Sequence, residues 1–473
     1  MADYTREFLT HRHQDYDENM KNWNFHLRSY LGGDDYTNGY FLNRYILESD
    51  EEYLKRQSFT ALDNHCRNVV QVYSSFLFRV PPTRDYGSLT GNPQLESFVK
   101  DADLDGRSFA HIIREMQMNA SIYGNCWAIV DKPSTQASSM AEELIQDIRP
   151  YLSIYTPENI TNWKYERSRN GRYFLTLLTV IEDINEERAI IKVWTPEDIC
   201  TYEIKDFMQE YKHSKPILLD EVPNALGEIP AVNLFNQKSQ KKAIGISDLS
   251  DVAELQQSIY NDYSEIEQLI RLSNHPSLVK TPNVEASAGA GSIIEMPEDM
   301  QADLKPYIIQ PSSQSLESIM NTIKMKVDAI NRITHMGSVR ATEKQVSSGI
   351  ALQTEFQLLN ARLSEKADLL ENAEEGIWTF FAKWQNQTFD GMIDYPDSFD
   401  LRDYASDLQF LQQAKASGVK SETFTKEIDK QIASAVIDDD DTINTINSEI
   451  DSATTAIGQF STPAIEGQEL AEE

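Results

Sequence analysis

The chain has 473 residues, of which 40% are hydrophobic and 25% are charged, as in ordinary soluble globular proteins. A chain of this length is expected to form roughly two to four domains. Its 75 Asp and Glu residues outnumber 43 Lys and Arg residues, and the formal net charge of −32 excludes a protein that grips nucleic acid over its whole surface. The charge fits either solubility alone or a surface that lets a polyanion pass without sticking, and it does not choose between them.

Targeting and covalent features are few. No stretch approaches the roughly 18 consecutive apolar residues of a membrane span, so no membrane partner is expected. Residues 1–17 are polar and charged, so no secretory signal is expected there. Cys66, Cys126 and Cys200 lie far apart without metal-ligand spacing, and are predicted to be buried thiols in a reducing cytoplasm.

The first half of the chain is predicted to pass from helices to strands. Apolar residues recur every three or four positions from Ser58 to Phe78, which predicts one helix ended by Pro81-Pro82. A second helix is predicted from Ser108 to Ser121, followed by a strand over Cys126–Val130. An antiparallel meander and one later strand are then predicted, with a hairpin turn at Asn170-Gly171, over residues 152–155, 160–165, 173–182, 189–194, 199–204 and 231–235.

The second half is dominated by long helices. Ser247-Asp248 is a predicted N-cap pair for an amphipathic helix of about 38 Å that ends near residue 273. Three short strands are predicted next, at residues 277–280, 292–296 and 307–310. A second helix is predicted from Ser315 to about residue 335, then a polar loop, and then the longest helix, residues 349–388, with Gly376 as a candidate bend.

The C-terminal part carries weaker signals. Residues 400–436 are predicted to form two or three shorter helices. The run of four aspartates at 438–441 is interpreted as a solvated acidic loop, with cation binding as the alternative. The tail rich in Ser, Thr and Glu beyond it is expected to be disordered.

Motifs of catalysis are missing from the sequence. It contains neither a phosphate-binding Gly-x-x-x-x-Gly-Lys-Ser/Thr loop nor a Gly-x-Ser-x-Gly elbow. Gly289 and Gly291 lie in a turn rich in Ala and Ser, and His11 and His13 lack the spacing of a helical metal site. No catalytic residue, metal ligand or cofactor is therefore predicted.

Two amphipathic helices bracketing a β-rich insert, followed by a loop and a longer helix, fit an ordinary helical hairpin with a β excursion. Several local patterns in this order nevertheless resemble tailed-bacteriophage portal proteins of the SPP1-like family. The most specific is the segment 224–236, containing Gly-Glu-Ile-Pro and a strand ending in Asn, followed by Gly245-Ile-Ser-Asp-Leu249. Similar patterns occur at residues 64–82, 120–130 and 155–160, so the resemblance runs across roughly residues 60–390.

The resemblance implies an α+β portal fold with an α/β wing, a two-helix stem, a small β-containing clip, a long wing helix and a helical crown. The implied boundaries are an N-terminal wing at 1–245, stem helices at 246–274 and 313–336, the clip at 275–312, a tunnel loop at 337–348, the long wing helix at 349–395, the crown at 396–448 and a disordered tail at 449–473.

The function implied by the resemblance is structural rather than enzymatic. Portal proteins form rings of roughly twelve subunits at a capsid vertex, through which double-stranded DNA is packaged, retained and ejected. The implied partners are other copies of the chain, the DNA, terminase and then a head-tail adaptor at the clip, and the major capsid protein or scaffold. The implied location is the virion, and the host cytoplasm during assembly. Two alternatives stay open: another α+β phage structural or interaction scaffold, and an enzyme with an acidic site.

Candidate functional residues follow from the implied architecture. In the tunnel loop, flexible cations would touch passing phosphates briefly, although exposed loop cations with no such role fit the sequence equally well. Trp378, Phe380, Phe381 and Trp384 have helical spacing, which favours packing in a core or subunit interface over base stacking. The remaining candidates are Ser338, Arg340, Lys344 and Gln345 in the loop, Lys324, Lys326 and Arg332 on the stem, and Lys280, Glu295, Asp299 and Lys305 in the clip.

Overall fold

The computed structural model describes most of the chain in two compact units, residues 1–399 and 400–473. The described residues are 4–133, 140–207, 214–274, 277–279, 301, 307–309, 313–337, 349–396, 398–399, 404–416, 419, 421–436 and 440–452. Among these residues, the first unit holds two main sheets and the long helices, and the second holds three short helices.

The larger sheet is a five-stranded antiparallel meander. Its strands follow chain order, as predicted: β4 (Ile160–Arg167), β5 (Tyr173–Ile184), β6 (Arg188–Trp194), β7 (Asp198–Lys205) and β8 (Ile217–Pro223). Gly171 turns the first hairpin with φ +83°, a conformation that suits glycine. The sequence did not predict β8, because this edge strand lacks the buried alternation of a core strand.

The smaller sheet lies at the centre of the unit and has the order β3-β2-β9, formed by β2 (Asn125–Asp131), β3 (Tyr151–Tyr155) and β9 (Ala231–Phe235). The prediction that residues 152–155 begin the meander is therefore wrong, because β3 pairs with β2 instead. Every residue of β2 is buried, as expected for a central strand covered on both faces.

Two helices pack against this central sheet: α7 (Phe109–Tyr123) and α12 (Gly349–Trp384). Gly376 does not interrupt α12; a Cβ on it would lie 3.1 Å from the Val232 side chain, so glycine lets the helix approach β9 closely. Trp378 and Phe381 are fully buried, which confirms their predicted core packing.

Helices of the N-terminal region surround this core. They are α1 (Arg6–Thr10), α2 (Gln14–Leu31), α3 (Gly33–Thr37), α4 (Asp50–Phe59), α5 (His65–Leu77), α6 (Pro93–Lys100) and α8 (Met140–Ile145). The single helix predicted from Ser58 is wrong at its start: α4 ends at Phe59, and α5 begins after Asn64, whose side chain accepts a hydrogen bond from the Arg67 amide at 2.8 Å. Cys66, Cys126 and Cys200 are buried free thiols, as predicted.

A strand pair joins distant parts of the chain. β1 (Thr83–Asp85) pairs antiparallel with β12 (Met392–Asp394), with Arg84 opposite Ile393. Arg84 also forms a two-pronged ion pair with the buried carboxylate of Glu374 on α12, at 2.8 and 2.9 Å. Residues more than 300 positions apart thus close the same side of the core. Two 3-10 turns, Gly87–Leu89 and Pro157–Asn159, complete the unit.

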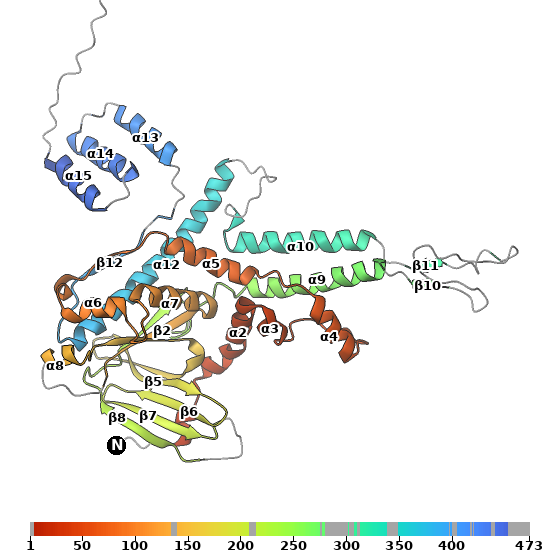
Figure 1. The fold of residues 1–473 in the computed structure, drawn as a ribbon, viewed down its shortest axis with the longest axis horizontal. Helices are drawn as coiled ribbons and strands as arrows, with labels where there is room; N and C mark the ends of the chain where they lie inside the picture. The colour runs from red at the N-terminus through yellow and green to blue at the C-terminus, as the bar shows by residue number, and fades with distance from the viewer. Residues whose placement is uncertain are drawn as a thin grey trace, which may run out of the picture. The chain divides into compact units, whose positions relative to one another are not determined.

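The predicted pair of amphipathic helices forms a hairpin. α9 (Val252–Asn274) and α10 (Ser313–Ile333) lie side by side (Figure 1). Beyond them, β10 (Ser277–Val279) pairs antiparallel with β11 (Tyr307–Ile309). These strands confirm the first and third of the three predicted in this segment, and the second lies outside the described residues.

The second unit contains α13 (Tyr404–Ala416), α14 (Glu422–Val436) and α15 (Asp440–Ser452). α15 corrects the expectation of an acidic loop running into a disordered tail from residue 449. Ile443, Ile446 and Ile450 give it an apolar stripe, and aspartates favour a helix N-terminus.

Candidate functional site

The α9–α10 hairpin is the candidate functional element, and one face of each helix holds it together. Ile259 on α9 and Ile323 and Ile330 on α10 are buried in the main core cluster. An ion pair between Lys326 on α10 and Asp262 on α9 adds a polar link between the helices. The hairpin is therefore an ordered part of the first unit.

The three predicted stem cations do not share one face of α10. Lys324 and Arg332 are exposed, whereas the Lys326 side chain is 21% exposed and its ammonium group faces Asp262. Positions 324 and 326 are about 200° apart around a helix of 3.6 residues per turn. Lys326 is therefore a link within the hairpin, and of the three cations only Lys324 and Arg332 face solvent.

The other predicted site residues lie outside the described part of the chain. This applies to Ser338, Arg340, Lys344 and Gln345 in the loop, and to Lys280, Glu295, Asp299 and Lys305 between the hairpin helices. What the structure does place is the frame around them. The loop follows α10 and precedes α12, and the insert is flanked by the β10–β11 pair.

The segment leading into α9 is fixed by a crossing of two glycines. A Cβ on Gly245 would lie 2.0 Å from the carbonyl oxygen of Gly124, which ends α7 with φ +101°. Just beyond, the Ser247 hydroxyl accepts a hydrogen bond from the Leu249 amide at 2.9 Å and donates to the Ser121 carbonyl. Ser247 thus stabilises a turn before α9, which begins at Val252, and it does not cap the helix as predicted.

Asp248, the other predicted cap, is the centre of a buried charge cluster. Its carboxylate lies 2.7 Å from the Lys366 ammonium and 3.2 Å from the Arg362 guanidinium, both on α12. Asn236 at the end of β9 completes the cluster: it accepts from Lys366 and donates to Asp248 at 3.1 Å. The cluster joins the start of α9 to the long helix.

Electrostatics favour the ionised form of Asp248. Burial by itself raises the pKa of this carboxyl, but the charges of Lys366 and Arg362 outweigh that effect and leave the pKa below its usual value. Burial lowers the pKa of Lys366, and Asp248 opposes that change. The sequence held a signal for this cluster, since Lys366 interrupts the apolar stripe of Leu359, Leu363 and Leu370.

A second buried ion pair fixes residues 40–56, which we call the arm, against α9. Arg56 on α4 forms two 2.7 Å hydrogen bonds with Glu48, and both side chains are almost fully buried. Arg56 also donates to Ser264 on α9 at 2.9 Å, and its guanidinium lies 4.1 Å from the centre of the Tyr45 ring. No periodic pattern marks residues 40–56 in the sequence, so this arm was not predicted.

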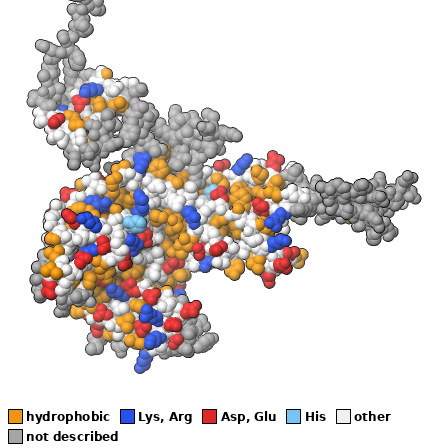
Figure 2. All heavy atoms as spheres, viewed as in Figure 1, with side chains coloured by type: hydrophobic (Ala, Val, Ile, Leu, Met, Phe, Trp, Pro, Cys, Tyr) orange, Lys and Arg blue, Asp and Glu red, His pale blue; other side chains and the backbone are white. Residues whose placement is uncertain are grey.

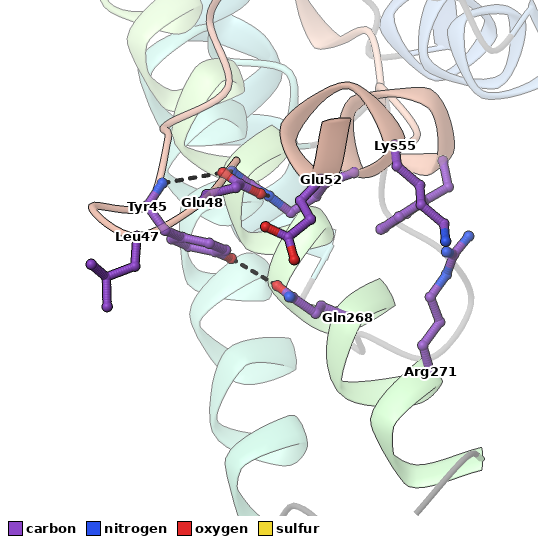
Figure 3. A pocket seen from close by; sticks show the side chains of 9 residues that line it. Tyr45, Leu47, Glu48, Glu52, Lys55, Gln268 and Arg271 are labelled. Atoms are coloured by element: carbon purple, nitrogen blue, oxygen red, sulfur yellow. Dashed lines mark hydrogen bonds and ion pairs between the residues drawn. The ribbon is translucent and has the colours of Figure 1, made fainter. Parts of the chain in front are cut away.

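A pocket of about 550 Å³ lies between this arm and the second half of α9 (Figure 3). Tyr45 crosses it and donates to Gln268 on α9, and the Arg271 guanidinium stacks 3.5 Å from the centre of the Phe59 ring. Its lining mixes aromatic rings with charged side chains, of which Glu48 and Arg56 are paired to each other.

Acidic and basic side chains are interspersed over the face of the described residues in Figure 2. Within the described part of the chain, no three His, Cys, Asp or Glu side chains are grouped to hold a metal ion. None of the described helices is long and apolar enough to cross a membrane.

Comparison with known proteins identifies the family to which the chain belongs. The family described as "Phage portal protein, SPP1 Gp6-like" matches residues 11–401. No curated protein matches the chain. Among solved structures, the "Virion of native gene transfer agent (GTA) particle" contains a similar chain with 10% identity and a TM-score of 0.39; 80% of this chain and 93% of that chain are covered. The "Neck of empty GTA particle computed with C6 symmetry" gives 9% identity, a TM-score of 0.40 and the same coverage. The family match covers both sheets, the hairpin and the long helix, and the chain therefore belongs to the SPP1-like family of phage portal proteins.

Proposed function

We propose that this portal protein assembles into a closed ring at a capsid vertex and that double-stranded DNA passes through its centre. The supporting observation is the hairpin. α10 buries Ile323 and Ile330 towards the body, while Met320, Met325 and Arg332 stay exposed along its other sides. A two-helix layer open on its outer side is suited to lateral contact with further copies, which in a ring close by rotation.

The loop at 338–348 and the exposed cation Arg332 are the proposed channel contacts. Arg332 lies at the end of α10, immediately before the loop that contains Arg340 and Lys344. A few cations in a chain of net charge −32 attract phosphates briefly without holding the DNA, since affinity grows with the number of phosphates neutralised. Ser338 and Gln345 complete the polar loop. Lys324 is the other exposed stem cation and a second candidate for this role.

The insert between α9 and α10 is the proposed docking site for terminase during packaging and for a head-tail adaptor afterwards. The β10–β11 pair is only three residues long on each strand, and so short a pair is marginal alone. Contact with neighbouring copies or with a partner protein stabilises such a pair. Lys280, Glu295, Asp299 and Lys305 are the proposed partner contacts. The wing and crown would meet the capsid protein or scaffold, in the virion and during assembly in the host.

Electron microscopy of the purified protein tests the ring. We expect particles with an axial hole, and a monodisperse monomer at high concentration would refute the proposal. The channel role is tested with Arg340→Glu combined with Lys344→Glu, which should leave rings intact and reduce DNA packaging or retention. Arg169→Glu with Arg172→Glu is the matched control, because these exposed cations lie in the β4–β5 turn. Normal packaging by the loop variant would remove the role assigned to the loop.

A further inference from the structure

The arm in front of α4 presents two apolar side chains to solvent. Ile46 is 100% exposed and Leu47 is 95% exposed, and we call this dipeptide the apolar knob. Figure 3 shows the Leu47 side chain pointing away from α9, while the Tyr45 ring points towards Gln268 on α9. Single exposed apolar residues are common on protein surfaces, but two adjacent and nearly fully exposed ones are unusual.

The knob is held in place by polar contacts of the residues on both sides of it. Glu48 is paired to Arg56, and the Tyr45 hydroxyl lies within hydrogen-bonding distance of Glu265 and Gln268 on α9. Asn43 is fixed as well, since its amide donates to the Asn261 side chain at 2.7 Å. Both ends of the knob are thus attached to the hairpin. Loops are ordinarily more mobile than the elements they connect, and these contacts restrict the arm instead.

A complementary surface lies on the other side of the hairpin. α9 lies between α4 and α10 (Figure 1). On α10, Met320 is 48% exposed, and the exposed Lys324 follows one turn later, about 40° from it around the helix. Methionine adapts its shape to irregular apolar partners, which suits a contact surface better than the wall of an aqueous channel.

The two surfaces lie at the same level along the hairpin. Lys326 contacts Asp262, which sets the register of the antiparallel helices. Tyr45 contacts Glu265 and Gln268, three and six residues further towards the hairpin's end, so the matching level on α10 lies just before Lys326, at residues 320–323. Equal levels allow the two surfaces to meet where the hairpins of neighbouring subunits lie side by side.

We propose that the apolar knob of one subunit packs on the Met320–Lys324 face of the next subunit in the ring. This inference rests on the proposed ring assembly and names its contact. Charge favours the same pairing: exposed Glu51 follows the knob at the start of α4, and Lys324 lies beside Met320 on α10. Among the residues that the structure describes, neither has an ion-pair partner within its own subunit. Lys324 is then a subunit contact, and Arg332 remains the stem cation of the channel.

Cross-linking tests the contact in the assembled protein. Leu47→Cys combined with Met320→Cys should, on oxidation, give a ladder of covalent oligomers up to the full ring. The native cysteines are buried and do not compete. Leu47→Cys with Arg169→Cys is the control and should give no ladder. Rings without cross-links in the first variant would overturn the contact and leave the ring standing; absence of rings in the unmodified protein would overturn both.

A charge exchange provides the second test. Lys324→Glu should abolish ring formation or reduce it at least tenfold, and adding Glu51→Lys should restore it. Arg332→Glu, also exposed on α10, should leave rings intact. If Lys324→Glu forms normal rings and only DNA passage is impaired, Lys324 lines the channel and the contact is wrong. Circular dichroism of each variant separates a loss of assembly from a loss of folding.

Discussion

Gly124 and Gly245 cross with so little space that a methyl group on either would overlap the other's backbone. Gly245 has no positive φ, so Gly245→Ala adds only a steric overlap with a carbonyl that no side-chain movement can relieve. We expect this variant to lose about 3 kcal/mol or more of unfolding free energy, measured with urea. Gly227→Ala, at φ +65° with open space around it, should lose only about 1–2 kcal/mol through backbone strain. Equal losses would show that no overlap exists at Gly245.

The Asp248 cluster predicts strong coupling between α9 and α12. Asp248→Asn leaves the buried Lys366 ammonium without its counter-charge and should cost about 3 kcal/mol or more. Adding Lys366→Met removes the unpaired charge. The double variant should therefore lose less unfolding free energy than the two single variants lose together. Lys326→Met, which breaks a partly exposed pair, should cost less than about 1 kcal/mol. Additive losses at Asp248 and Lys366 would contradict the coupling.

His26 predicts an acid-dependent loss of stability. Burial lowers the pKa of this imidazole from 6.5 to about 4 in the folded chain, because its charged form would lose hydration. The unfolded chain therefore takes up a proton at a higher pH than the folded chain does. The unfolding free energy that depends on neutral His26 is fully present above pH 6.5. It falls by roughly 3 kcal/mol as the pH is lowered to about 4.

The His26 contribution is isolated by comparison with His26→Gln. The unfolding free energy of each protein is measured at pH 7, 5.5 and 4. As the pH falls, the unmodified protein should lose more unfolding free energy than the variant. NMR titration should place the imidazole pKa near 4. A pKa close to 6.5, or parallel pH dependences of the two proteins, would refute the assignment.

Trp378 predicts a structural role for the aromatic residues of α12. Its ring is fully buried, packed 4.7 Å from the Phe109 ring centre and 5.4 Å from that of Phe98. Trp378→Ala should cost about 3–5 kcal/mol. Trp384→Phe removes one hydrogen bond to the Val130 carbonyl and should cost about 1 kcal/mol. If Trp378→Ala kept full stability while weakening DNA retention, a stacking role would replace the packing role.

The elements that the sequence predicted well are those with strong local periodicity. Alternation and turn residues located β4 to β7, and apolar stripes located α9, α10 and α12. Pairing between distant strands has no local signal, which is why β3 was assigned to the wrong sheet. The predicted helix boundary is wrong where Asn64 caps the start of a new helix within a continuing apolar pattern.

Residues of the candidate site could be predicted only where a charged residue interrupts the apolar pattern of a helix. Lys324, Lys326 and Arg332 were visible as cations on an amphipathic helix, but periodicity could not show that Lys326 faces Asp262 on the other helix. Asp248 was read as a helix cap because Asp is common there, whereas its partner Lys366 lies more than one hundred residues away. The apolar knob gave no signal, since exposure of Ile46 and Leu47 depends on the fold.

The pairing of β1 with β12 has a consequence for how the protein is made. A ribosome adds residues 392–394 about three hundred residues after residues 83–85, and the whole hairpin is synthesised in between. Until α12 has emerged, β2 and Trp127 lack their cover. A prematurely terminated chain thus leaves its central sheet open, while a finished one seals it. Completion of α12 and β12 is thus a condition for the central sheet to be covered.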